Sequence, residues 1–327
     1  MIDWNEHHGK AFQGVRCLVT GGAGFIGSHI VEALVALDAD VVVIDDLSGG
    51  SWNNLAGFGD GVKQITGSIL DGDLIAEACD GVHYVFHEAA LGSVPRSVEQ
   101  PVLYHEVNVM GTLSLLEAAR AAGVQRVVYA GSSSAYGDPP DDGPKVETMP
   151  PLPRSPYAAA KLAAEHQMRC WSHSYGLDTA VTRYFNIFGP RQNANSAYAA
   201  VIAAFAKALL TGQQAMIFGD GEQSRDFTFV HNAVHANLLA ARHDGPLEGE
   251  VFNTACGQRI SVNTLYYQMA KLLGQPDNQP QYHPERAGDV KHSLAVIKKA
   301  EQTLGYQPLV SFEAGLKQTV EWYKLQF

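Results

Sequence analysis

Tyr157 and Lys161 are the two residues whose types and spacing best suit proton transfer. They stand four positions apart in the segment 155–176, which has the composition of a long helix, so both side chains lie on one face. A lysine ammonium beside a phenol favours the phenolate and lowers the tyrosine pKa, so that a tyrosine can act as a base near neutral pH. Such pairs also occur by chance on many helices, so other residues must decide whether this one is functional.

A run of three serines, Ser132 to Ser134, precedes this pair in the chain and follows a short apolar segment. Their hydroxyl groups can donate and accept hydrogen bonds beside a reacting oxygen. The next residue, Ala135, cannot carry a proton. The run therefore offers hydroxyl groups and no carboxyl group.

Glycines recur at three-residue spacing in "LVTGGAGFIGSH", as Gly21, Gly24 and Gly27. They follow a predicted strand and open a predicted helix, where glycine allows a tight turn and close approach of the backbone to a pyrophosphate. Asp45 ends the next predicted strand, and an acid there accepts hydrogen bonds from an adenosine ribose and repels a 2′-phosphate. With no arginine near Asp45, the pattern favours NAD over NADP. The alternative is a structural glycine turn in another α/β protein.

The composition argues against several classes of function. The chain of 327 residues has a formal net charge of −11, which disfavours a broad surface for nucleic acid or anionic membranes. Its four cysteines show no CxxC spacing, so we expect the reduced thiols of a cytoplasmic protein and neither a disulfide framework nor a metal site. We expect no membrane span and no secretory signal, because the required apolar patterns do not occur.

The first half of the chain alternates short apolar runs with helical segments. Such a series predicts an α/β fold with a doubly wound parallel sheet, the Rossmann fold. Beyond residue 187, loops separate predicted helices, which indicates a smaller, mostly helical domain. We therefore expect an NAD-binding domain over 1–187, joined by a returning strand near 249–256, and a substrate-binding domain over 188–327. The predicted strands are 15–20, 40–45, 82–87, 124–131 and 178–185, and the later helices are 197–211, 230–243, 261–273 and 313–324.

Together these features resemble the extended short-chain dehydrogenase/reductase superfamily and, within it, the NAD-dependent epimerase/dehydratase family. The chain is most similar to the bacterial UDP-N-acetylglucosamine 4-epimerases and UDP-glucose 4-epimerases. The resemblance spans nearly the whole chain, because the matching segments occur in order: "TGGAGFIGSH", "HEAALGSVPRS", "NVMGT", "SSSAYGD", "SPYAAAK", "RYFNIFGPRQ", "SAYAAVI", "GDGEQSRDFTFV" and "RAGDVKHS".

The resemblance implies a 4-epimerase of UDP-hexoses that works through a transient 4-keto sugar. Tyr157 would take the proton of the sugar 4-hydroxyl while NAD accepts the hydride, which later returns to the other face of the sugar. The resemblance assigns Lys161 to the nicotinamide ribose and to lowering the tyrosine pKa, and Ser132 to a hydrogen bond with the 4-oxygen. NAD should stay bound, because the hydride returns within one cycle.

The resemblance also assigns residues to NAD, with one departure from the family pattern. Ser68 stands where many relatives have an acid that holds the adenine, so we expect this contact to be weaker or to pass to Asp71. The residues implied for NAD are Gly21, Gly24, Phe25, Ile26, Gly27, Asp45, Ser68, Ile69, Ala89, Ala90, Asn108, Tyr157, Lys161 and Tyr184.

On the substrate side, Arg225 and Arg286 resemble the arginines that grip the diphosphate, which suits the bidentate geometry of a guanidinium. Asp289 resembles the acceptor for the uridine ribose, and Asn186 a contact to the sugar diphosphate. A surface ion pair is the alternative for each arginine, and ordinary helix packing explains Ala199 and Val201 equally well. The residues implied for the substrate are Ser93, Ser133, Asn186, Ala199, Val201, Phe218, Arg225, Arg286, Asp289 and Ser293.

Ser293 bears on the choice of sugar. It occupies the place where a tyrosine narrows the sugar pocket of epimerases restricted to unacetylated sugars, so we expect UDP-GlcNAc and UDP-GalNAc to be accepted. The alternative is that Ser293 is only a loop hydroxyl. UDP-glucuronate 4-epimerases are similar too, but tend to have Thr at the place of Asn186 and an extra Arg near Asn193.

Two other functions remain as alternatives. Dehydratases and decarboxylases share the fold, but the dehydratases place Asp and Glu where this chain has Ser133 and Ser134. A non-catalytic NAD-binding module would usually lack the tyrosine or the lysine, and this chain has both. The resemblance further implies a homodimer that packs through helices near 90–120 and 155–176.

Overall fold

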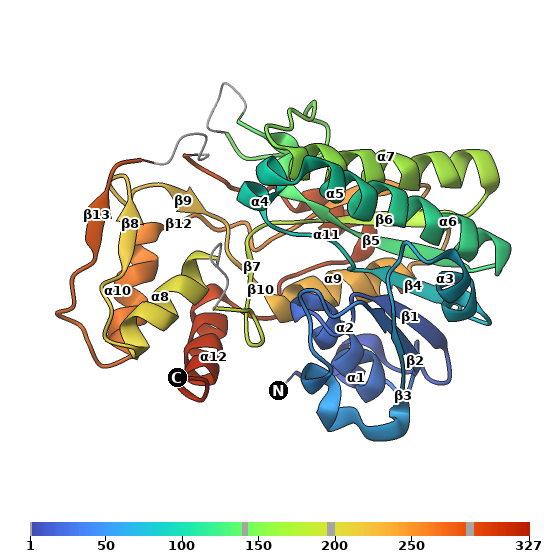
Figure 1. Cartoon of the computed structure of the whole chain (residues 1–327), viewed down its shortest axis with the longest axis horizontal. Coiled ribbons are helices and arrows are strands. Elements are labelled where there is room, and N and C mark those ends of the chain that lie inside the picture. Colours follow the sequence, from blue (N-terminus) through green and yellow to red (C-terminus); the bar gives the residue numbers. More distant parts are fainter. Residues whose placement is uncertain (1, 139–142, 195–199, 286–290) are drawn as a thin grey trace.

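A seven-stranded parallel sheet lies at the centre of the larger part of the molecule (Figure 1). The computed structural model describes residues 2–138, 143–194, 200–285 and 291–327. The chain order reverses at β1, which pairs with β2 on one side and with β4 on the other. In the order of the sheet the strands are β11 (Glu250–Thr254), β6 (Asp178–Tyr184), β5 (Arg126–Ser132), β4 (Tyr84–His87), β1 (Arg16–Thr20), β2 (Asp40–Asp45) and β3 (Val62–Thr66).

The strands form where β-branched and other apolar residues run together, because a parallel sheet is buried on both faces. In β2, for example, every residue after Asp40 is buried. The α/β fold with a doubly wound parallel sheet, predicted from the sequence, is confirmed. β11 follows residue 187 in the chain and lies at the edge of this sheet, parallel to β6.

Helices cover both faces of the sheet (Figure 1). α2, α9 and α11 pack on one face, and α3, α6 and α7 pack on the other. In the described ranges, no helix combines the length and the apolar character that crossing a membrane requires. The ranges are α2 (Phe25–Ala36), α3 (Gly72–Cys79), α4 (Val94–Glu99), α5 (Pro101–His105), a π-helical turn (Glu106–Met110), α6 (Gly111–Ala121), α7 (Pro156–Tyr175), α9 (Val230–Arg242) and α11 (Lys298–Leu304).

A second hydrophobic core holds together the smaller part of the molecule, on the left of Figure 1. Three amphipathic helices surround it, and short paired strands close it. α9 connects the two cores, because Val230 packs in the second core and Leu238 in the core beneath the sheet. The elements are α8 (Val201–Leu210), α10 (Val262–Leu272), α12 (Phe312–Lys324), β7 (Ile187–Phe188), β8 (Met216–Phe218), β9 (Ser224–Arg225), β10 (Thr228–Phe229), β12 (Ile260–Ser261) and β13 (Gln281–His283).

The N-terminal helix α1 (Trp4–His8) packs against α2 and α9. Its N-cap, Asp3, accepts hydrogen bonds from two backbone N–H groups of the first turn. Trp4 and His8 are buried, and His8 Nε2 lies 3.1 Å from Nδ1 of His235 on α9. The N-terminal segment therefore packs against α9.

Candidate active site

A tight glycine turn connects β1 to α2. Gly21 has φ +66°, and a Cβ there would lie 2.7 Å from the backbone nitrogen of Ala89. A Cβ on Gly27 would lie 2.3 Å from the carbonyl oxygen of Gly21. The three glycines of the motif thus allow contacts that a side chain would prevent. The N-cap residue of α2, Gly24, has no side chain, so no capping side chain covers the backbone N–H groups at the N-terminus of this helix.

Asp45 lies where β2 ends, beside this turn. Its carboxylate accepts hydrogen bonds from the backbone N–H of Ala23 at 3.0 Å and of Leu47 at 2.8 Å. Burial raises the pKa of Asp45, and the hydrogen bonds from these two N–H groups counteract the effect. Two carboxylate oxygens have about four lone pairs, so Asp45 can still accept hydrogen bonds from a ligand.

A cavity of about 400 Å³ opens in front of the glycine turn, at the carboxyl ends of the strands. Ligands of open α/β sheets bind at this edge, where the chain order reverses. The cavity is also lined by Glu88, Arg96 and Tyr104, which sequence reasoning did not single out. The predicted residues that line this cavity are Gly21, Gly24, Phe25, Ile26, Gly27, Asp45, Ser68, Ile69, Ala89, Ala90 and Ser93.

Several predicted residues support this cavity or lie beside it. Asn108 is buried and holds both backbone groups of Leu91, accepting from its N–H at 2.8 Å and donating to its carbonyl at 3.1 Å. Leu91 itself lines the cavity. Asp71 caps α3 by accepting a hydrogen bond from Leu74 N, whereas Ser68 lines the cavity.

Ser132 and Tyr157 come together where β5 ends and α7 begins. Ser155 caps α7 by accepting a hydrogen bond from the backbone N–H three residues further on, at 3.1 Å, which places Tyr157 in the first turn. Ser132, the last residue of β5, hydrogen-bonds the Tyr157 phenol. Ser132 Oγ also lies 2.8 Å from Ser134 Oγ, so the tyrosine is the end of a short chain of hydroxyl groups.

The surroundings of Tyr157 favour the neutral phenol. Burial raises the pKa of Tyr157, the Ser132 hydroxyl lowers it, and the nearby phenol of Tyr104 raises it. The two tyrosine rings meet edge to face with their centres 6.5 Å apart. Of these three influences only the Ser132 hydroxyl lowers the tyrosine pKa, and the expected lowering by Lys161 stays a prediction.

The Lys161 ammonium lies over the ring of Tyr129, with Nζ 4.3 Å from the ring centre. Burial lowers the pKa of Lys161 to about 8, and the negative charges of Glu88 and Glu165 raise it. The lysine charge therefore interacts with two carboxylates and with an aromatic face.

Glu88 is a site residue that sequence reasoning missed. It follows β4, lines the large cavity and accepts a hydrogen bond from the Tyr184 hydroxyl at 2.7 Å. Asn237 Nδ2 donates to the same hydroxyl at 2.6 Å. Burial raises the pKa of Glu88 to about 7, while Tyr184 and Lys161 lower it. An acid at the carboxyl end of a strand, in "HEAALGS", is the sequence signal that could have revealed it.

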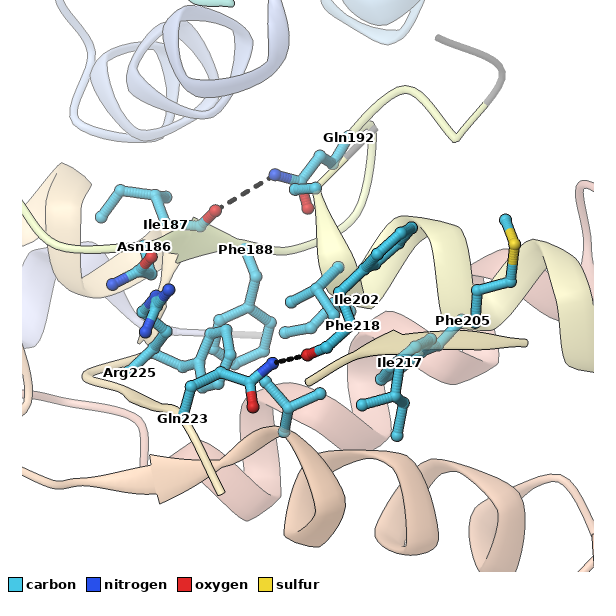
Figure 2. Close-up of a pocket in the computed structure, with 15 residues that line it drawn as sticks. Asn186, Ile187, Phe188, Gln192, Ile202, Phe205, Ile217, Phe218, Gln223 and Arg225 are labelled. Carbon is cyan, nitrogen blue, oxygen red and sulfur yellow. Dashed lines mark hydrogen bonds between the residues drawn. The ribbon is translucent and has the colours of Figure 1, made fainter. Parts of the chain in front are cut away.

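A second cavity, of about 270 Å³, lies in the smaller part of the molecule (Figure 2). Arg225 and Asn186 lie at the same end of this cavity, while apolar side chains such as Ile217 line the other end. Sequence reasoning missed two glutamines here. Gln192 donates to Ile187 O at 3.1 Å, and Gln223 to Phe218 O at 2.6 Å. The predicted residues that line this cavity are Asn186, Val201, Phe218 and Arg225.

The remaining predicted substrate residues are placed elsewhere or fall outside the described ranges. Ser293 lies on the segment beside β9, where its N–H donates to Ser224 O at 3.0 Å. Ser133 begins the short 3₁₀ turn after β5. Ala199, Arg286 and Asp289 lie outside the described residues.

The comparisons with known proteins identify the family of this chain. The model of the NAD dependent epimerase/dehydratase family matches residues 17–255. The chain is 42% identical over 316 residues to the UDP-glucose 4-epimerase of Mycolicibacterium smegmatis, covering 95% of this chain and 99% of that protein. The chain belongs to the NAD-dependent epimerase/dehydratase family.

Solved structures of this family resemble the chain over nearly its full length. The UDP-N-acetylglucosamine 4-epimerase of Methanobrevibacter ruminantium M1, in complex with UDP-N-acetylmuramic acid, is 41% identical with a TM-score of 0.91, covering 96% of this chain and 100% of that one. The UDP-glucose 4-epimerase of Thermotoga maritima, with UDP-glucose, is 39% identical with a TM-score of 0.90, covering 95% and 99%.

The family is NAD dependent, and the residues of the large cavity fit this cofactor. The glycine turn leaves room for close approach of a pyrophosphate, since a Cβ on Gly21 or Gly27 would instead meet backbone atoms. Asp45 at the end of β2 provides the acceptor that a ribose diol needs. NAD is therefore the cofactor of this protein.

Proposed function

We propose that this protein is a 4-epimerase of UDP-hexoses, which interconverts UDP-GlcNAc with UDP-GalNAc and UDP-Glc with UDP-Gal. The observation that carries the proposal is the hydrogen bond between Ser132 and Tyr157, at the same edge of the sheet as the NAD cavity. Lys161 lies one helical turn further along α7. Two relatives with 42% and 41% identity are named as 4-epimerases, which supports the same assignment.

In this proposal Tyr157 takes the proton from the sugar 4-hydroxyl and later gives it back. Ser132 hydrogen-bonds the 4-oxygen and the phenol, so it can hold the oxygen in line for the transfer. Bound NAD supplies reversible hydride acceptance at the sugar carbon. Lys161 stabilises negative charge on the tyrosine and holds the nicotinamide ribose, and Tyr184 and Asn108 support the same cofactor region.

The proposed substrate residues include four that line the second cavity. Arg225 and Asn186 would bind the diphosphate end, since a guanidinium suits bidentate phosphate contacts. Ser293, next to β9, leaves room for an N-acetyl group in this proposal. We also propose contacts with the UDP-sugar for Ser93, Ser133, Ala199, Val201, Phe218, Arg286 and Asp289.

The serines after Ser132 distinguish epimerisation from elimination. A dehydratase needs a further acid and base beside the 4-keto sugar. Ser133 and Ser134 occupy those places, and their hydroxyl groups do not ionise near neutral pH. The intermediate is therefore expected to be reduced again rather than to lose water.

The test is to incubate the purified protein with UDP-Glc, UDP-GlcNAc and UDP-glucuronate, and to separate the products. We expect 4-epimers of the first two and no 4-keto-6-deoxy product. The Tyr157→Phe variant should keep its bound NAD and lose about 10²–10⁴-fold in kcat. Undiminished epimerisation by that variant would refute the mechanism, and turnover of UDP-glucuronate alone would replace the substrate assignment.

We further propose a homodimer that packs through the helices near 90–120, which are α4, α5 and α6, and through α7. Val98 and Val102 are 65% and 70% exposed on α4 and α5, and Met110 is 45% exposed in the following π-helical turn. Exposed apolar side chains gathered on neighbouring helices favour burial against a partner. Light scattering of the eluting protein should give twice the mass of one chain, and a monomeric mass would exclude the dimer.

The cysteines support a cytoplasmic location in this proposal. All four are free thiols, and two of them, Cys17 and Cys79, are buried. Free thiols persist in reducing compartments. Fractionation of the cells that make the protein, followed by detection of the chain, tests the location.

A further inference from the structure

The segment 186–192, which we call the cavity wall, belongs to the second cavity and also reaches the NAD-binding helix α2. It follows the end of β6, so it leads from the sheet into the smaller part of the molecule. Four of its residues line the second cavity, namely Asn186, Ile187, Phe188 and Gln192 (Figure 2). The contacts of this wall with α2 therefore bear on where the second cavity lies relative to the NAD cavity.

Arg191 attaches the cavity wall to α2 through its side chain. Its Nη1 donates to Ser28 Oγ at 3.3 Å, and its Nη2 donates to Glu32 Oε2 in an ion pair. On the same helix, His29 donates from Nε2 to Pro190 O at 3.0 Å. Two adjacent residues of the wall are thus held by one face of the helix whose N-terminus forms the glycine turn.

The backbone of Arg191 is a second sign that these contacts matter. Its φ of +67° lies in the left-handed region, which is unfavourable for an arginine. A residue persists in such a conformation only where its surroundings hold it there, and such positions cluster at functional sites. The contacts of the guanidinium with α2 provide that hold.

Apolar contacts join the same two elements. Ile26 of α2 lines the NAD cavity, and Ile187 of the wall lines the second cavity. Both pack against one small buried cluster, which consists of Ala130, Tyr184 and Ala233. The N-terminus of α2 and the cavity wall therefore meet directly between the two cavities.

The cavity wall is also attached to the smaller part of the molecule, independently of α2. Asn186 O accepts from Thr228 N at 3.2 Å, and Asn186 Nδ2 donates to Asp226 O at 3.3 Å. Tyr323 of α12 donates its hydroxyl proton to Gln192 O at 2.7 Å. Loss of the contacts with α2 would leave these bonds in place, so it would change the position of the wall relative to α2 rather than its attachment to the second cavity.

We propose that Arg191 is a positioning residue, which holds the second cavity against α2 and thereby aligns the sugar of a bound UDP-hexose with NAD. This inference rests on the proposed function, in which the second cavity binds the UDP end of the substrate. Reaction between two bound molecules depends on their alignment, and a misplacement of about 1 Å can cost about 100-fold in rate. Arg191 is not among the described residues that line either cavity, so it acts through the wall that it holds.

The experiment compares the wild-type holoenzyme with Arg191→Asn. Asparagine adopts the left-handed conformation more readily than arginine, so the variant keeps the backbone turn and loses the contacts with α2. We expect kcat per bound NAD to fall about 10- to 100-fold, while the KM for the UDP-sugar and the NAD content stay as in the wild type. Arg191→Lys should recover part of the loss, because it keeps the charge for Glu32 but has one nitrogen in place of two.

Glu32→Gln tests whether Arg191 acts through α2. It should also lower kcat, and the double variant with Arg191→Asn should be no slower than Arg191→Asn alone, because both changes remove one ion pair. If Arg191→Asn does not fold, Glu32→Gln replaces it in the comparison with the wild type. Lys63→Gln is the matched control, because Lys63 forms an exposed ion pair with Glu77 and should leave kcat, KM and NAD content unchanged.

A second readout does not depend on turnover. Hydrogen–deuterium exchange of the peptide that covers 186–194 reports how firmly the cavity wall is held. We expect faster exchange of this peptide in Arg191→Asn and in Glu32→Gln than in the wild type, and no change in Lys63→Gln. Equal exchange in all four proteins would show that Arg191 does not hold the wall.

The result that overturns the inference is an unchanged kcat in Arg191→Asn. A KM that rises while kcat stays the same would likewise overturn it, because Arg191 would then act in substrate binding. A wild type that converts no UDP-hexose would refute the proposed function instead. In that case the exchange comparison would still decide whether Arg191 holds the wall against α2.

Discussion

The two cavities of this protein are built in different ways. The NAD cavity contains a close backbone contact, because the glycine turn after β1 approaches the segment that follows β4 so nearly that a Cβ on Gly21 would meet Ala89. The second cavity is formed by side chains from β7, α8, β8, β9 and α10, which are far apart in the chain. Backbone contacts fix the residue type, whereas side-chain contacts can be exchanged. The cofactor is therefore tied to the fold, while the choice of sugar nucleotide can change without disturbing the sheet.

The largest effect should come from Gly21→Ala, which places a side chain in the backbone contact of the NAD cavity. The φ of +66° and the 2.7 Å approach of a Cβ to Ala89 N both oppose the change. We expect complete loss of bound NAD, measured by release from the denatured protein, and loss of all activity. Gly57→Ala is the control, because Gly57 lies outside the residues that line this cavity and a Cβ there meets open space. Retained NAD in Gly21→Ala would show that backbone contact does not define this cavity.

The next effect tests whether the second cavity is independent of the first. Arg225→Lys keeps the charge and loses the bidentate geometry, so the KM for the UDP-sugar should rise about 10- to 100-fold. The NAD content should stay as in the wild type. Arg120→Lys, at an exposed pair with Glu117 on α6, should change neither quantity. Loss of NAD from Arg225→Lys would contradict the separation of the two cavities.

A third effect concerns α9, which joins the two cores. Burial lowers the pKa of His8 to about 3 and the pKa values of His231 and His235 to about 4, from an ordinary value of 6.5. The unfolded chain therefore binds protons that the folded chain excludes, and stability falls as the pH drops below 6.5. At pH 5 each histidine should cost about 2 kcal/mol of the free energy of unfolding.

Urea denaturation at pH 7 and pH 5 measures this loss. His231→Phe should reduce the difference between the two pH values, and phenylalanine suits the site because the His231 ring packs edge to face against Trp4 and Phe229. His173→Gln, in the exposed last turn of α7, should leave the difference unchanged. Equal stability at pH 7 and pH 5 would contradict this prediction, because it would show that these histidines bind protons as readily in the folded chain as in the unfolded chain.

The smallest effect distinguishes Ser68, which lines the NAD cavity, from Asp71, which caps α3. Asp71→Ala removes the N-cap of α3 and should lower the free energy of unfolding by about 1 kcal/mol, with NAD affinity unchanged. Ser68→Ala, in the cavity lining, should weaken NAD binding and leave stability unchanged. Binding titrations with NAD and urea denaturation measure the two quantities. The reverse pattern would assign the adenine contact to Asp71.

Features that depend on local spacing could be predicted from the sequence. The glycine turn, Asp45 at the end of the next strand, and the pair of Tyr157 and Lys161 on one helix face all follow from residues near each other in the chain. The strands could be predicted because burial on both faces demands continuous apolar runs. The family resemblance of the motifs also allowed the prediction of four substrate residues, and these four line one cavity.

Contacts between residues that are far apart in the chain could not be predicted in this way. Glu88 and Tyr184 are 96 positions apart and touch because both lie at the carboxyl ends of their strands, at an edge set by crossover topology rather than by local pattern. The same holds for Lys161, whose ammonium lies over the ring of Tyr129 on β5. Helix spacing could place Lys161 on one face with Tyr157 and Glu165, but it could not show Glu88, which follows β4.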